Sequence, residues 1–183
     1  MTEFQNFVIV VFPLGLQGKI WTTILRSQNI SVIWESPDVH IVETLKQLHR
    51  QSRPLPNLLI LDTRLRGLNP YALCRWCRHH CPEMKIVLVN GAQPQILPSE
   101  QQWARCQGAA DLLPCFHRDS LISSAVTGLR EILDLLGGVP LNQRALISTL
   151  LKLGFGPRLR SKPNSCSVKS KMALMSAQST LAW

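Results

Sequence analysis

Acidic residues are missing from the C-terminal part of the sequence, and this absence accounts for the basic charge of the protein. All 11 Asp and Glu residues lie within positions 1–134, where 13 Lys and Arg residues leave a net charge of +2. Positions 135–183 carry seven Lys and Arg residues and no acidic residue. The chain has 183 residues, 45% of them apolar, so we expect a folded domain with a basic appendage rather than wholesale disorder.

A long hydrophobic run and a dense set of cysteines are also absent. The longest apolar run, residues 7–16, contains Pro13 and Gly15 and is too short to cross a bilayer, so no membrane span is predicted. The opening residues Met-Thr-Glu do not resemble a secretory signal. Six cysteines are too sparse for a disulfide framework in a chain of this length. We therefore expect a cytoplasmic protein with reduced thiols.

Short apolar stretches alternate with stretches of helical periodicity. Strands are expected at residues 7–12, 30–34, 58–61, 85–89 and 110–113, and helices at 16–27, 36–48, 71–81, 99–107 and 120–136. Ser36 and Pro37 are expected to open the second helix as its cap and first residue. Apolar strands joined by helices of this length predict a parallel sheet covered on both faces, which is a doubly wound α/β fold.

The segment at residues 58–75, LLILDTRLRGLNPYALCR, resembles the third strand, loop and third helix of the receiver domain of bacterial response regulators. A second segment, GAADLLP at residues 108–114, is similar to the part of that domain that enters the fifth strand. The resemblance covers residues 6–137 and implies a flavodoxin-like, five-stranded sheet in the order 2-1-3-4-5. It makes Asp62 the candidate phosphoacceptor, a carboxylate nucleophile.

The resemblance also implies a degenerate pocket around Asp62. The family places two acidic residues just after the first strand to hold Mg²⁺, whereas this chain has Phe12 and Pro13 there. The hydroxyl residue that follows the fourth strand falls at Asn90 or Gly91, and the lysine that follows the fifth strand at Cys115.

These replacements predict weak or absent phosphotransfer, because that reaction depends on positioning and on a metal that compensates charge. We therefore expect no cofactor, and Mg²⁺ only if Asp62 is a working phosphoacceptor. The alternatives left open are a phosphorylated Asp62 and a purely structural Asp62. Arg64 and Arg66 are the nearest sources of positive charge, and Glu35 or Asp38 the remote replacement acids.

Three cysteines, Cys74, Cys77 and Cys81, are spaced so that one face of a helix presents all of them. A metal site would draw ligands from a second segment, and the sequence has no second C-x-x-C pair. Packing against the sheet is therefore the favoured interpretation, with metal or redox chemistry as the alternative. The neighbouring His79 and His80 are expected at a solvated helix end.

The C-terminal part is expected to form two further segments. Residues 138–154 predict a short amphipathic helix, and residues 155–183 a basic, disordered tail. The apolar side of the helix would consist of Leu146, Ile147, Leu150 and Leu151. The tail predicts nonspecific contact with nucleic acid, and a DNA-associated transcription regulator is the alternative function, although no helix-turn-helix pattern is visible.

The resemblance implies a non-enzymatic signalling protein that works by protein contact. Its partner would be a histidine kinase or another component of a two-component system, and a homodimer is left open. In the family, the fourth helix, fifth strand and fifth helix form the contact face. In this chain that face corresponds to residues 99–107, Leu112, Leu113 and residues 120–136.

Overall fold

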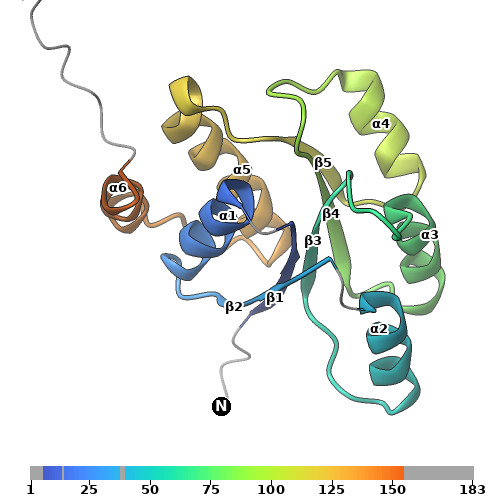
Figure 1. Cartoon of the computed structure of the whole chain (residues 1–183). Coiled ribbons are helices and arrows are strands. Elements are labelled where there is room, and N and C mark those ends of the chain that lie inside the picture. Colours follow the sequence, from blue (N-terminus) through green and yellow to red (C-terminus); the bar gives the residue numbers. More distant parts are fainter. Residues whose placement is uncertain (1–5, 14, 38–39, 155–183) are drawn as a thin grey trace, which may run out of the picture.

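The computed structural model describes residues 6–13, 15–37 and 40–154 of the chain. Within them, five strands form one parallel sheet in the order β2-β1-β3-β4-β5 (Figure 1). The predicted doubly wound α/β fold and its strand order are confirmed. The strands are β1 (Phe7–Val11), β2 (Ser31–Glu35), β3 (Leu58–Asp62), β4 (Lys85–Asn90) and β5 (Asp111–Pro114).

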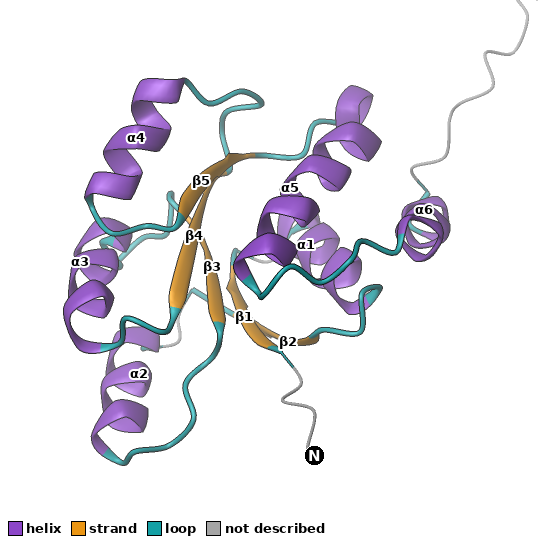
Figure 2. Ribbon diagram, turned by 180° about the vertical axis from the view of Figure 1, so that it is seen from behind, coloured by secondary structure: helices purple, strands orange, loops and turns teal. Residues whose placement is uncertain are grey.

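Helices cover both faces of the sheet. Two of them, α1 and α5, lie on one face, whereas α2, α3 and α4 lie on the other (Figure 2). The helices are α1 (Leu16–Arg26), α2 (Ile41–Arg50), α3 (Pro70–His80), α4 (Pro98–Cys106), α5 (Leu121–Leu135), preceded by the 3-10 turn η1 (Arg118–Ser120), and α6 (Gln143–Lys152).

The strands bury both of their faces because nearly every strand residue is apolar. Along β3 every residue is buried, and its side chains alternate between the two helical layers. Leu58 and Ile60 pack with α1 and α5, whereas Leu59 and Leu61 pack with α2, α3 and α4. Asp62 is the last residue of this central strand, so the polar group lies where the sheet's carboxyl edge begins.

The start of α2 differs from the prediction. The helix begins at Ile41 with His40 as the capping residue, so Ser36 and Pro37 do not open it. The physical reason is that β2 continues to Glu35, which pairs with Val11 of β1. Ser36 and Pro37 therefore lie in the connection that follows β2.

The α6 helix is joined to the body of the molecule by its cap and by its inner side. The Asn142 side chain accepts a hydrogen bond from the backbone N–H of Ala145 at 3.0 Å. The Asn142 backbone N–H donates to Gln28 Oε1 at 2.8 Å, just beyond α1. Leu146 and Leu150 are buried in the same cluster as α1 and α5.

The predicted apolar side of α6 is therefore divided between core and solvent. Leu146 and Leu150 are 0% and 1% exposed, whereas Ile147 and Leu151 are 44% and 48% exposed. The connection to α5 is made possible by Gly138, which has φ of 74° and whose backbone N–H donates to the carbonyl of Leu133 at 3.0 Å.

Two expectations fall on residues outside the described ranges. The predicted tail at residues 155–183, with its predicted contact with nucleic acid, lies there, as does Asp38. Among the helices of the described part, none combines the length and the apolar character that crossing a bilayer requires.

The docking of α6 predicts a contrast between two neighbouring residues. Leu146→Ala should lower the free energy of unfolding by about 2–3 kcal/mol, because it opens a cavity beneath the inner side of α6. Ile147→Ala, the matched exposed control, should change it by less than about 0.5 kcal/mol. Urea denaturation measures both values. Equal effects of the two substitutions would contradict the packing described for α6.

Candidate functional site

Asp62 is completely buried, and both of its carboxylate oxygens are bonded to one residue. Its Oδ1 accepts the backbone N–H of Arg64 at 2.9 Å and Arg64 Nε at 3.1 Å. Its Oδ2 accepts Arg64 Nη2 at 2.8 Å. A carboxylate followed two residues later by arginine can form this arrangement locally, because the turn brings the backbone N–H and the side chain to the same group. The guanidinium thus grips Asp62 in the two-pronged geometry that matches a carboxylate.

Arg64 places a permanent positive charge at this end of the sheet. Its side chain is 50% exposed, whereas that of Asp62 is 0% exposed. The hydrogen bonds to Asp62 raise the pKa of the Arg64 guanidinium further, and partial burial opposes this only in part. The Arg64 guanidinium therefore stays protonated at neutral pH and well above it.

Gly91, just after β4, leaves the space that this ion pair fills. A Cβ atom at Gly91 would lie 2.5 Å from Asp62 Oδ2 and would overlap Arg64 Nη2. Real Cβ atoms do not approach other atoms this closely, so any other residue would displace the guanidinium.

Asn90, the other predicted position, is the last residue of β4, and its side chain bonds within the loop that follows. Its Oδ1 accepts the backbone N–H of Ala92 at 3.1 Å, and its Nδ2 donates to Gln93 Oε1 at 2.7 Å. Both hydrogen-bonding groups of the side chain are therefore engaged in shaping the connection to α4. Of the two residues predicted for the family's hydroxyl position, Gly91 is the one that borders Asp62.

Cys115, just after β5, lies close enough to Asp62 and Arg64 for their charges to act on it. Burial raises the pKa of the Cys115 thiol, while Arg64 lowers it and Asp62 raises it to a smaller extent. The side chain is therefore a neutral thiol near pH 7. At this position, where the resemblance implies a lysine, the side chain of this protein therefore carries no positive charge.

Phe12 and Pro13, which replace the family's acidic pair, do not take part in the site. Phe12 is 1% exposed and packs in the core with α1 and α5. Its carbonyl oxygen accepts a hydrogen bond from Trp34 Nε1 at 3.3 Å. Pro13 is exposed. The region after β1 is thus committed to packing rather than to charge.

Glu35 does not replace the missing acids. It lies at the end of β2, which is separated from β3 by β1, so its backbone is about 10 Å from that of β3. Within the described ranges, no group of three or more His, Cys, Asp or Glu residues is placed to hold a metal ion.

The residues around Asp62 do not fit the Mg²⁺ ion that the receiver fold implies. Mg²⁺ requires near-octahedral oxygen ligands at about 2.0–2.1 Å. Here both oxygens of the single carboxylate already accept hydrogen bonds, and its nearest charged neighbour is a cation. A metal ion would have to displace the guanidinium, and among the described residues no group of three or more potential ligands is placed to receive it.

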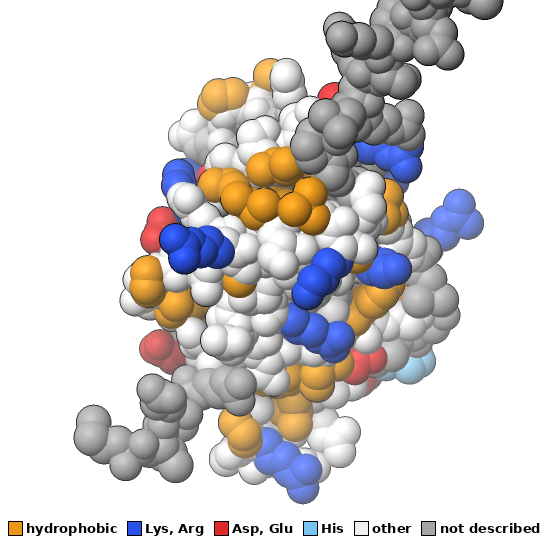
Figure 3. Space-filling view, turned by 90° about the vertical axis from the view of Figure 1, so that its left-hand side faces the viewer, with side chains coloured by type: hydrophobic (Ala, Val, Ile, Leu, Met, Phe, Trp, Pro, Cys, Tyr) orange, Lys and Arg blue, Asp and Glu red, His pale blue; other side chains and the backbone are white. Residues whose placement is uncertain are grey.

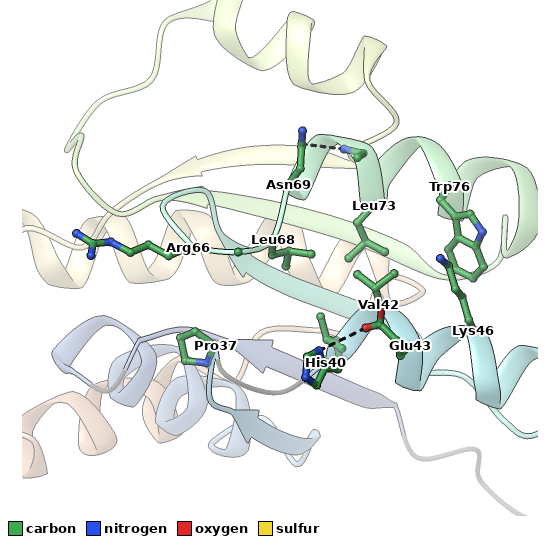
Figure 4. A pocket seen from close by; sticks show the side chains of 13 residues that line it. Pro37, His40, Val42, Glu43, Lys46, Arg66, Leu68, Asn69, Leu73 and Trp76 are labelled. Carbon is green, nitrogen blue, oxygen red and sulfur yellow. Dashed lines mark hydrogen bonds and ion pairs between the residues drawn. The ribbon is translucent and has the colours of Figure 1, made fainter.

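Arg66 lies away from this site, on a groove of about 500 Å³ between α2 and α3. Figure 4 shows Arg66 at the opposite end of the groove from Trp76, with Val42, Leu68 and Leu73 between them. Only Arg64 of the two predicted arginines therefore compensates Asp62. The signal for Arg64 in the sequence is its position two residues after the carboxylate, together with a glycine after β4.

The three clustered cysteines, two in α3 and one at its C-terminal end, are buried on the side of the helix that packs against the sheet. Cys74, Cys77 and Cys81 are 0%, 2% and 4% exposed and belong to one apolar cluster. Burial raises the pKa of both Cys74 and Cys77 to about 12, so they remain protonated thiols. These properties favour packing over metal or redox chemistry. His79 and His80 are exposed, as expected for a helix end.

A second groove lies on the predicted contact face, which is formed by α4, β5 and α5. It measures about 460 Å³ and is floored by Leu113 and Phe116, with Thr127 and Glu131 on its α5 side. Leu112 was expected on this face but is 3% exposed and packs beneath α3 and α4. Leu113 is equally buried but points to the other layer, because successive β5 residues alternate between the two faces of the sheet.

Two polar atoms among the residues that line this second groove are without a hydrogen-bond partner. They are Trp21 Nε1 and Glu131 Oε2, both buried within the described structure. Burial raises the pKa of Glu131, and Asp111 adds to the effect. A buried polar group without a partner costs free energy, so these two atoms lower the stability of this part of the fold.

Comparison with known proteins supports the fold. No family model matches the chain, and no curated protein matches it by sequence. Solved structures do match it. A response regulator receiver protein from Burkholderia phymatum is 22% identical, with a TM-score of 0.55 over 75% of this chain and 100% of that one.

Two further receiver domains give similar values. That of the putative response regulator NarL from Mycobacterium tuberculosis is 19% identical, with a TM-score of 0.51 over 73% of this chain and 98% of that one. That of a putative Luxo repressor protein from Vibrio parahaemolyticus is 14% identical, with a TM-score of 0.52 over 81% and 98%. The chain thus has the fold of response regulator receiver domains.

The burial of Cys74 and Cys77 predicts that a thiol reagent will label the cysteines of the folded protein selectively. At about pH 8, iodoacetamide should modify exposed Cys106 but leave Cys74 and Cys77 unmodified until the protein is unfolded. Mass spectrometry of the peptides reads this out. Rapid labelling of Cys74 or Cys77 in the folded protein would contradict their burial.

The same thiols predict the direction of alkaline destabilisation. Their pKa is raised from 9.0 to about 12, so the unfolded chain loses these protons first as the pH rises. Their contribution to the free energy of unfolding is complete below pH 9.0 and is lost as the pH rises towards 12. Urea denaturation at increasing pH should therefore show a steeper loss of stability for the wild type than for Cys74→Ala/Cys77→Ala.

The ion pair predicts coupling between Gly91 and Arg64. Gly91→Ala should cost about 1–3 kcal/mol, because the new methyl group pushes the guanidinium off a buried carboxylate. In the Arg64→Ala background the same substitution should cost about 1 kcal/mol less, since no guanidinium remains to be displaced. Urea denaturation of the four proteins of this cycle gives the coupling. Simple additivity would show that the two residues do not share this space.

Proposed function

We propose that this protein is an atypical receiver-like module of a two-component or related signalling system in the cytoplasm, which acts by protein contact and without phosphotransfer. The observation that carries the proposal is the two-pronged ion pair between Arg64 and buried Asp62. A histidine kinase or another component of such a system is the partner that the receiver fold suggests.

The charges around Asp62 support the proposal that its carboxylate does not accept a phosphoryl group. Phosphoryl transfer depends on groups that position the phosphoryl and compensate its charge. An acyl phosphate on Asp62 would break at least one of the hydrogen bonds from Arg64. Its charge would then face Arg64 alone, because Cys115 is neutral and Phe12 is apolar. Arg64 therefore acts as a fixed counterion in place of a metal that comes and goes.

The contact face supports action through a partner. The elements that border the groove also carry exposed apolar side chains outside it: Leu97 just before α4, Trp103 on α4 and Ile122 on α5, which are 63%, 51% and 40% exposed. Trp103 is held in place by an edge-to-face contact with Tyr71, with ring centroids 4.5 Å apart. Aromatic side chains presented in this way are typical anchors of protein interfaces.

The proposal predicts that Asp62 does not react with phosphoryl donors or their analogues. Pure protein incubated with acetyl phosphate, or with beryllofluoride and Mg²⁺, should show no Asp62-dependent mass adduct and no shift of amide signals near Asp62 in NMR spectra. Asp62→Asn is the matched control, because it keeps the shape of the side chain and removes the nucleophile.

An adduct that forms on the wild type and is lost in Asp62→Asn would overturn this proposal in favour of a phosphoacceptor receiver. A second variant tests the reason. Arg64→Ala frees the carboxylate but adds no metal ligand, so it should remain without adduct while its stability falls by about 1–3 kcal/mol. Adduct formation in Arg64→Ala alone would show that Arg64, rather than the absence of acidic residues after β1, prevents the reaction of Asp62 with phosphoryl donors.

A further inference from the structure

The outer side of α6 carries a stripe of basic and apolar residues. Arg144, Ile147, Ser148, Leu151 and Lys152 follow one another at spacings of three, one, three and one, so they share one side of the helix. All five are exposed. Ile147 and Leu151 lie one turn apart, between a cation near each end of the helix.

The contacts of α6 fix the direction in which this stripe faces. Leu146 and Leu150 anchor the opposite side in the core, and the Gln28–Asn142 hydrogen bonds hold the start of the helix at 2.8 and 3.3 Å. The helix cannot turn to bury Ile147 and Leu151 without exposing these two leucines. The exposed apolar pair is therefore a fixed feature of the folded surface.

The surroundings of the stripe are basic on the α1 side, whereas α5, which also packs against α6, carries Glu131 and Asp134. Neither α6 nor the adjacent α1 contains an acidic residue, and α1 adds the exposed cations Lys19 and Arg26. In Figure 3, which views the α6 side, hydrophobic side chains form a row near the centre, Lys and Arg lie around them, and acidic groups lie towards the margins. The sequence that follows α6 contains further cations at Arg158, Arg160, Lys162, Lys169 and Lys171 and no acid.

Beyond the proposed function, we propose that the outer side of α6 binds the surface of an anionic lipid bilayer. Such a surface attracts cations and at the same time accepts apolar side chains at the boundary of headgroups and acyl chains. Ile147 and Leu151, flanked by Arg144 and Lys152, match both properties. A nucleic acid backbone would satisfy the cations only, and the exposed apolar pair would gain nothing from it.

The stripe makes two separate contributions to binding, which can be removed one at a time. Each basic residue near an anionic surface strengthens binding about fivefold, so Arg144→Gln/Lys152→Gln should weaken it about 25-fold. Ile147→Ser/Leu151→Ser should weaken it about tenfold, because the apolar contact is lost while the charge is unchanged. The first effect should shrink at high salt, whereas the second should persist.

The test is co-sedimentation of the full-length protein with vesicles of phosphatidylcholine, alone or mixed in equal parts with phosphatidylglycerol. The wild type should bind the mixed vesicles and not the neutral ones. Arg50→Gln on α2 is the matched charge control, and Leu97→Ser near α4 the matched apolar control, since both residues are exposed outside the α6 stripe. Both controls should bind like the wild type, and circular dichroism checks that every variant is folded.

Three outcomes would overturn the proposal. One is that the wild type does not bind the anionic vesicles. Another is that both α6 variants bind as tightly as the wild type, which would assign any binding to the cations outside the stripe. The third is that a mixed-sequence DNA duplex binds the wild type while vesicles do not, and that Arg144→Gln/Lys152→Gln abolishes this binding whereas Ile147→Ser/Leu151→Ser leaves it unchanged.

Discussion

The buried carboxylate of Asp62 determines which neighbouring groups the carboxyl edge of the sheet can hold. A carboxylate at the end of a central strand is removed from water, and an ionised group there must be compensated by hydrogen bonds and opposite charge. Arg64 provides both from a position two residues away. Because the guanidinium is part of the chain, compensation is permanent. A receiver that is switched by a metal and a phosphoryl group needs compensation that can be exchanged.

The neighbouring replacements are consistent with this fixed arrangement. Gly91 leaves room for the guanidinium, and Phe12, expected at an acidic position of the family, packs in the core. Cys115 keeps a neutral group beside a pair that is already balanced. A lysine there would have left an excess positive charge next to Arg64. Under the proposed function, these residues form one physical solution, in which packing and one internal ion pair take the place of exchangeable ligands.

The two sides of α6 show how one amphipathic segment can serve two purposes. Its inner leucines complete the core between α1 and α5, so the helix is held as part of the folded body. Its outer side exposes Ile147 and Leu151 among cations on a surface without nearby acids in the same helix. Exposed apolar side chains that occur singly are common, but a fixed pair on a basic surface is a feature that a partner can use.

The sequence alone determined the alternation of strands and helices, the order of the sheet through its resemblance to receiver domains, and the location of Asp62 at a strand end. Period and composition are local properties, so they predict which residues point inward and where elements begin to within a few residues. They could not place the start of α2, because the extent of β2 depends on its pairing with β1. Tertiary structure decided that Arg64, and not Arg66, grips Asp62, and that Ile147 and Leu151 face solvent while Leu146 and Leu150 do not. The spacing of two residues allows the Arg64 contact, but Gly91 from the segment after β4 leaves the space for it, and the neighbouring helices decide which side of α6 is buried. Helical or strand periodicity carries no information about such neighbours.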